Sequence, residues 1–119
     1  MGRKTFESLP GMLPNRTHVI ISRRSDYKPE GCIVVESLEK AIDYFPKEQD
    51  KFVIGGGEIF KLAMPSADMI ELTRVHANVD GDTFFPEIDL NIWKLSNTEF
   101  HPKDERHNYE FTYETYVRK

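Results

Sequence analysis

Cysteine is almost absent from this chain of 119 residues, since Cys32 is the only one. A single cysteine excludes an internal disulfide. Long apolar runs are also missing: no stretch approaches the ~20 residues that cross a bilayer, and no signal peptide opens the chain. We therefore expect a cytoplasmic protein that does not associate with membranes.

Several familiar binding motifs are missing as well. The four histidines stand at positions 18, 76, 101 and 107, and none has a second ligand at metal-binding spacing, so no metal site is predicted. The chain contains no GxGxxG fingerprint. It also lacks a Walker A loop, because no Gly-Lys-Ser/Thr follows the glycines at 55–57.

Positive charge is scarce except at the start of the chain. The formal net charge is −4, which argues against a nucleic-acid-binding protein. Residues 1–24 nevertheless carry five cations against one acid, a local charge of +4, so the remaining residues carry −8. This separation predicts a small anionic ligand at the basic segment, with the acidic remainder repelling polyanions. The five cations are Arg3, Lys4, Arg16, Arg23 and Arg24.

The length and composition fit a single globular domain over residues 1–119, with 39% hydrophobic and 30% charged residues. Apolar spacing predicts an α/β fold with a largely parallel sheet and an antiparallel edge. Ser37 is a predicted N-cap. The expected strands are 17–22, 32–36, 51–54 and 69–76 with a hairpin of 93–100 and 109–117, and the expected helices are 3–9, one from Ser37 to before Pro46, and 58–64.

Three short segments could bind phosphate. The glycines at 55–57 precede a predicted helix, and a helix start offers free N–H groups to an anion. Residues 2–5 repeat this pattern with two cations and a hydroxyl, and residues 22–24 add a serine and two arginines. A plain tight turn or a solvated charged surface explains each segment alone equally well or better. Together, however, they favour a ligand with several phosphates, such as a dinucleotide.

Six ordered motifs make nearly the whole chain resemble the bacterial dihydrofolate reductases. They are Met1-Gly-Arg-Lys-Thr-Phe-Glu-Ser-Leu, Leu13-Pro-Asn-Arg16, Ile20-Ile-Ser-Arg23, Ile54-Gly-Gly-Gly-Glu-Ile-Phe60, Leu72-Thr73 and Gly81-Asp-Thr-Phe-Phe-Pro86. The resemblance implies a three-layer α/β fold with a mixed, mainly parallel sheet and a C-terminal antiparallel hairpin. One central strand of that sheet, near the N-terminus in the family, is missing from this chain.

The same resemblance implies NADPH as the cofactor. Arg3 and Thr5 would contact its phosphates, with Gly2 and Lys4 nearby, and Ser22, Arg23 and Arg24 would bind the 2′-phosphate. Gly55, Gly56 and Gly57 would let the pyrophosphate approach, with a cis bond between the first two. Ile59 and Phe60 would border the cofactor, the Phe60 ring near the nicotinamide. Glu58 departs from relatives that carry a basic residue there.

On the folate side, the resemblance implies that Arg16 pairs with the α-carboxylate of the glutamate tail, a bidentate contact that lysine would not reproduce. Ser8, Leu9, Leu13 and Ile54 would line the pterin and aminobenzoyl pocket, although core packing explains the apolar ones without the family. Thr73 would hydrogen-bond and orient the catalytic carboxylate. The alternative for Thr73 is an ordinary β-branched strand residue.

Family members have roughly forty further residues before the motif that begins at Met1. Those residues supply the central strand and the acid that serves proton donation to the pterin, so the catalytic acid is absent from this chain. We expect a longer parent protein, or another segment that fills the gap. A monomer is expected if the protein is complete, and a strand-exchanged assembly if it is truncated.

The predicted function is therefore NADPH-dependent reduction of 7,8-dihydrofolate to 5,6,7,8-tetrahydrofolate, within one-carbon metabolism, with dihydrofolate and antifolate-type inhibitors as ligands. Two alternatives stay open. One is a riboflavin-pathway reductase of the same fold, against which Arg16 argues because a neutral ribityl chain would not need it. The other is a non-catalytic NADPH-binding fragment that needs a partner segment.

Overall fold

The computed structural model describes all 119 residues. They divide into two compact units, unit 1 from Met1 to Pro65 and unit 2 from Ser66 to Lys119. No helix combines the length and hydropathy required to cross a membrane.

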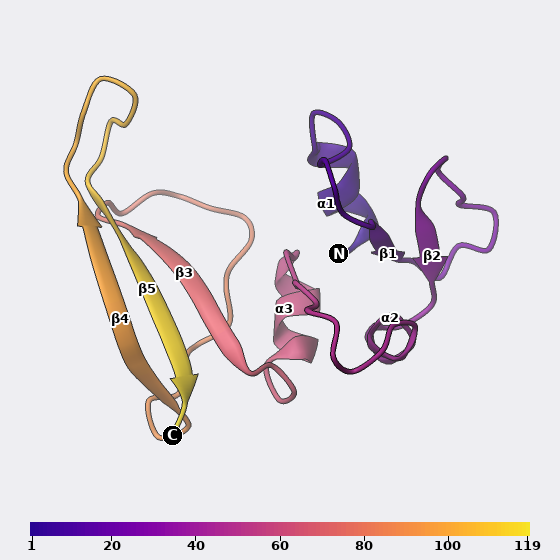
Figure 1. The fold of residues 1–119 in the computed structure, drawn as a ribbon. Helices are drawn as coiled ribbons and strands as arrows, with labels where there is room; N and C mark the ends of the chain where they lie inside the picture. Colours follow the sequence, from indigo (N-terminus) through magenta and orange to yellow (C-terminus); the bar gives the residue numbers. More distant parts are fainter. The chain divides into compact units, whose positions relative to one another are not determined.

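Unit 1 contains two short parallel strands and three short helices (Figure 1). The strands β1 (Val19–Ile21) and β2 (Ile33–Val35) pair in parallel, with Ile20 opposite Val34. Ile20 is fully buried, as its place in a β-branched run predicts. The helices are α1 (Arg3–Ser8), α2 (Leu38–Asp43) and α3 (Gly57–Ala63), all within two residues of the predicted starts.

The predicted cap of α2 is confirmed. Ser37 has an extended backbone, and its Oγ accepts a hydrogen bond from the backbone N–H of Lys40 at 3.2 Å. This satisfies one of the donors that a helix start leaves without an intrahelical partner. The helix ends at Asp43, with Tyr44 as its C-cap, before Pro46.

Met1 and Gly2 connect β1 to the glycine turn. The Met1 amino group donates to the carbonyl of Val19 at 3.0 Å, and the Ile21 N–H donates to the carbonyl of Met1 at 2.8 Å. On the other side, the Gly2 N–H donates to the carbonyl of Gly55 at 2.8 Å. The two glycine segments predicted to bind phosphate are therefore joined directly by a backbone hydrogen bond.

The predicted strand at 51–54 is wrong. These residues have no regular secondary structure, and the side chains of Phe52 and Ile54 are 82% and 41% exposed. A strand requires a neighbour to pair with its N–H and C=O groups. Only the carbonyl of Gly55, just past the segment, receives such a bond, from Gly2.

Unit 2 is an antiparallel sheet in the order β3-β5-β4 (Figure 1). Its strands are β3 (Met69–Val75), β4 (Trp93–His101) and β5 (Phe111–Arg118). The predicted hairpin is confirmed by the antiparallel pairing of β4 with β5, which contains a register shift between Leu95 and Asn97. Its buried apolar residues are Ile70, Trp93, Phe111 and Tyr116.

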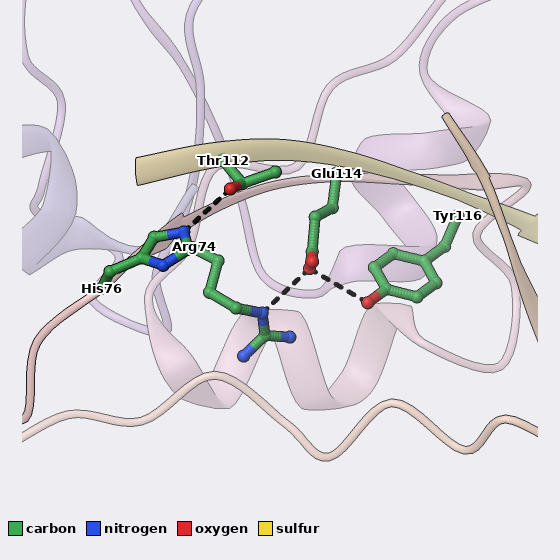
Figure 2. Close-up of polar contacts among 5 residues, drawn as sticks. All are labelled: Arg74, His76, Thr112, Glu114 and Tyr116. Atoms are coloured by element: carbon green, nitrogen blue, oxygen red, sulfur yellow. Dashed lines mark hydrogen bonds and ion pairs between the residues drawn. The ribbon is translucent and has the colours of Figure 1, made fainter. Parts of the chain in front are cut away.

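Polar side chains line one face of the β3–β5 pair (Figure 2). Glu114 accepts from the Nε of Arg74 and from the hydroxyl of Tyr116, each at 3.0 Å. Two residues further along each segment, His76 Nε2 lies 2.8 Å from Thr112 Oγ1. Alternate residues of a strand share a face, so this polar ladder leaves the other face to Phe111 and Tyr113, whose rings are 5.4 Å apart.

The α/β class is thus confirmed, with both the parallel and the antiparallel pairing that the sequence predicts. The strands form two separate sheets, one in each unit, instead of one continuous sheet.

Candidate functional site

Gly55 and Gly56 form a turn that side chains would obstruct. Gly55 has a φ of +113°, and a Cβ there would lie 3.1 Å from Cε2 of the Phe60 ring. A Cβ on Gly56 would lie 3.4 Å from the Thr5 hydroxyl. The cis Gly55–Gly56 bond implied by the resemblance is present. The turn is therefore bare backbone packed against Phe60 and Thr5, with Gly55 buried and Gly56 half-buried, and glycine is the residue type that fits there.

Two helix starts meet at this turn. The N-cap residues are Gly2 for α1 and Gly56 for α3, and neither offers a side chain to the first-turn N–H groups. Those groups remain available to an external acceptor, and the positive ends of the helix dipoles favour an anion. Thr5 adds a hydroxyl from α1.

Arg3 is the cation of the α1 segment whose side chain makes two contacts within the protein. Its Nη1 lies 3.5 Å from Oε1 of Glu7, one helical turn along, and its guanidinium carbon lies 5.8 Å from the centre of the Tyr27 ring. These contacts hold the guanidinium while about a third of the side chain stays exposed. Lys4 is exposed beside it.

Residues 22–24 directly follow β1 and form a tight polar turn. The Ser22 N–H donates to the carbonyl of Val35 at 2.9 Å, and Ser22 Oγ accepts from the Arg24 N–H at 3.2 Å. Arg24 Nε lies 3.7 Å from Oδ1 of Asp26, so its charge is partly matched. Arg23 is exposed, and no ion pair is seen at its guanidinium.

The first turn of α3 carries the remaining predicted cofactor residues. Gly57 and Glu58 begin the helix, and Glu58 is exposed. Ile59 Cγ1 would lie 3.6 Å from a Cβ on Gly2, so Ile59 packs against the α1 start. The Phe60 ring covers Gly55. Glycine turns, unblocked N–H groups and several cations in unit 1 fit a ligand with more than one phosphate.

A cavity of about 620 Å³ lies within unit 1. Three residues predicted for the folate pocket line it, namely Leu13, Arg16 and Ile54. Its floor is apolar, because α2 contributes Leu38, Ala41 and Ile42 followed by Phe45. An apolar floor together with the cations Arg16 and Lys51 in the lining suits a flat ring system that carries an anionic tail.

The other three predicted folate residues do not line this cavity. Ser8 is exposed and its hydroxyl donates to the carbonyl of Thr5 at 2.7 Å, while Leu9 caps α1. Thr73 belongs to unit 2, where it lies on β3 opposite Tyr113. The structure thus brings together part of the predicted folate set.

His18 is one of the cavity residues that sequence reasoning did not assign to the site. His18 was considered only as a metal ligand, yet its side chain is 2% exposed and accepts a hydrogen bond from the backbone of Leu13. The available signal was its position, two residues after Arg16 and directly before the apolar strand β1. Three or more His, Cys, Asp or Glu side chains that could hold a metal ion do not converge anywhere in the structure.

Comparisons with known proteins point to one family. A family model described as dihydrofolate reductase matches residues 1–118. The chain is 39% identical over 119 residues to a dihydrofolate reductase of Bacillus subtilis, which covers all of this chain and 71% of the relative. It is also 39% identical to a dihydrofolate reductase of Haemophilus influenzae, again over the whole chain and over 74% of the relative.

A solved structure agrees with these relatives. Dihydrofolate reductase from Enterococcus faecalis, complexed with NADP(H) and RAB-propyl, superposes with a TM-score of 0.88 at 40% identity. The match covers 99% of this chain and 71% of that one.

Proposed function

This chain belongs to the dihydrofolate reductase family, and we propose that its unit 1 binds NADPH along the two glycine segments and anchors folate through Arg16. Members of the family are oxidoreductases that reduce 7,8-dihydrofolate to 5,6,7,8-tetrahydrofolate with NADPH, and they bind antifolate inhibitors. The observation that carries the proposal is the 2.8 Å bond from Gly2 to Gly55, which joins two uncapped helix starts.

For the cofactor, the first-turn N–H groups of α1 and α3 would receive the pyrophosphate oxygens. Arg3, Thr5 and the nearby Lys4 would add charge and a hydroxyl on the α1 side. Ser22, Arg23 and Arg24 would receive the 2′-phosphate, a dianion that suits guanidinium groups. Ile59 and Phe60 would border the cofactor. When bound, NADPH supplies the hydride, and these residues only hold and orient it.

For the substrate, Arg16 would pair with the glutamate α-carboxylate at the mouth of the unit 1 cavity. Leu13 and Ile54 would contact the apolar part of folate, which the floor formed by α2 also favours. Roles for Ser8 and Leu9 in the pterin pocket, and for Thr73 in orienting a catalytic carboxylate, rest on the family resemblance alone.

Three broader features belong to the same proposal. Units 1 and 2 would form one domain, which the match of a single family model over residues 1–118 supports. The net charge of −4 disfavours nucleic acid as a partner. A cytoplasmic location agrees with the single cysteine. A monomer is expected if the protein is complete, and a strand-exchanged assembly if it is truncated.

A calorimetric comparison of NADPH with NADH tests the cofactor assignment. The two differ only in the 2′-phosphate, so Arg23→Gln should weaken NADPH binding about tenfold, the value of one charge-assisted hydrogen bond, and leave NADH binding unchanged. Lys47→Gln removes an equal charge from an exposed loop and serves as the control. An equal loss of affinity for NADPH and NADH in Arg23→Gln would contradict the assignment. So would an equal loss of NADPH affinity in Arg23→Gln and Lys47→Gln.

A further inference from the structure

His18 is a buried titratable residue that the proposed function does not use. It follows the exposed residues 14–17 and directly precedes β1, and its side chain is 2% exposed. Its carbonyl accepts from the Ile33 N–H at 3.0 Å, which fixes its backbone to the start of β2. The Phe6 ring meets the imidazole edge to face, at 6.5 Å between centres.

The imidazole accepts a hydrogen bond from within its own loop. Nε2 receives the backbone N–H of Leu13 at 3.0 Å. A neutral imidazole has one acceptor nitrogen and one N–H, so this bond requires the proton to lie on Nδ1, which is buried without a partner. The bond spans five residues and closes the loop from Leu13 back onto the strand that follows it.

That loop has little else to hold it. Residues 14–17 are exposed, and Asn15 has a φ of +60°, a conformation that non-glycine residues adopt infrequently. Arg16 bonds only locally, from Nε to the carbonyl of Pro14 at 3.1 Å. The hydrogen bond from Leu13 to the His18 ring therefore ties the start of this loop to a buried side chain.

We propose that His18 is a positioning residue for recognition of the folate glutamate, acting through the Leu13 N–H to fix the loop that carries Arg16. This inference rests on the proposed role of Arg16. It assigns His18 a selective effect: ligands with a glutamate tail depend on it, and ligands that occupy only the ring pocket do not.

The test compares two ligands by calorimetry on the NADPH-loaded chain, folate and a 2,4-diaminopyrimidine that lacks a glutamate. His18→Phe keeps an aromatic ring but removes the acceptor and leaves the Leu13 N–H unpaired. We expect it to weaken folate binding about tenfold and diaminopyrimidine binding less than about twofold. His18→Gln restores a side-chain acceptor at about the reach of Nε2 and should recover part of the loss.

Arg16→Ala separates failure of this inference from failure of the proposed function. Arg16→Ala should weaken folate selectively, and adding His18→Phe to it should cost nothing further, because His18 acts through Arg16. If Arg16→Ala leaves the ratio of the two affinities unchanged, or if the unaltered chain binds no folate, the proposed role of Arg16 is wrong and the inference falls with it. If Arg16→Ala is selective and His18→Phe is not, only the inference is wrong.

A measurement on the unaltered chain covers the case in which His18→Phe does not fold. The Leu13 amide should exchange with solvent at least about tenfold more slowly than the exposed Thr17 amide, because only the former is bonded to a buried acceptor. Equal exchange at the two amides would overturn the proposal.

Discussion

The two units of this chain show different ways of holding functional residues. In unit 2 the strands run for seven to nine residues and pair along their length. In unit 1 the strands are three residues long and the helices six or seven. All the predicted ligand-binding residues except Thr73 belong to unit 1. Regular secondary structure is thus sparse where binding is concentrated.

Unit 2 also buries more apolar side chains than unit 1. Unit 2 buries Ile70, Trp93, Phe111 and Tyr116, whereas unit 1 buries only Ile20 and Ala63 among its apolar side chains. Unit 1 instead depends on individual hydrogen bonds, from Met1 and Gly2 to their neighbours and from Leu13 to His18. Substitutions in unit 2 should therefore change stability most, and those in unit 1 should change binding most.

The largest effect should come from Trp93→Ala in unit 2. Trp93 is 3% exposed, and the Arg118 guanidinium lies 4.5 Å from the centre of its ring. Removing a buried tryptophan costs about 3–5 kcal/mol of unfolding free energy, measured by urea titration with circular dichroism. Phe84→Ala, at a side chain 76% exposed, should cost less than about 0.5 kcal/mol. Similar costs for both would show that the unit 2 core is not as described.

Gly55→Ala in unit 1 should reduce both stability and NADPH binding, whereas Trp93→Ala should reduce stability. The alanine would have to adopt a φ of +113° with its Cβ 3.1 Å from Phe60, a strain of about 1–3 kcal/mol. Displacing the turn should also weaken NADPH more than about tenfold by calorimetry. Gly11→Ala is the control, because nothing lies within 4 Å of a Cβ there. Unchanged NADPH affinity in Gly55→Ala would separate the turn from the cofactor site.

Glu58→Arg should strengthen NADPH binding a few-fold at low salt. The carboxylate lies in the first turn of α3, where it would repel the phosphates proposed to bind there. The gain should shrink at 0.5 M salt, since exposed charges are screened. Glu39→Arg makes the same change in the first turn of α2 and should leave NADPH affinity unaltered. Equal gains in both variants would indicate a general charge effect.

The smallest effect concerns acid stability at the β4–β5 connection in unit 2. Hydrogen bonds from the His107 side chain and the Arg106 and His107 N–H groups hold the pKa of Asp104 below its usual value. The stabilisation is therefore present above the ordinary carboxyl pKa of about 3.9 and is lost as pH falls through the lower folded value.

Asp104→Asn should accordingly reduce the difference in urea midpoint between pH 6 and pH 3, whereas Asp80→Asn, at an exposed carboxylate, should preserve it. An unchanged pH dependence in Asp104→Asn would contradict this account of the connection.

The sequence predicted correctly those helices and strands that depend on residues close together in the chain. Ser37 caps α2 because its side chain needs only a neighbouring N–H, and the β4–β5 hairpin forms because its two arms are close in sequence. The strand at 51–54 is wrong for the opposite reason, since an apolar run becomes a strand only beside a partner from elsewhere in the chain.

The residues of the candidate site likewise differ in whether local sequence or a tertiary contact determines them. The glycines at 55 and 56 were identified because their backbone requirements are visible in the sequence. The role of His18 was not visible, because it depends on a buried bond to Leu13 that no spacing rule encodes. For Thr73, the strand was predicted and is confirmed, whereas its role in orienting a catalytic carboxylate stays a prediction from the family resemblance.

Amide hydrogen exchange with and without NADPH tests most directly whether unit 1 is the binding unit and unit 2 the scaffold. We predict that NADPH slows exchange at residues 2–5, 22–24 and 55–60 of unit 1, and leaves β4 and β5 of unit 2 unchanged. Slowed exchange confined to β4 and β5, or no change anywhere at saturating NADPH, would contradict the account.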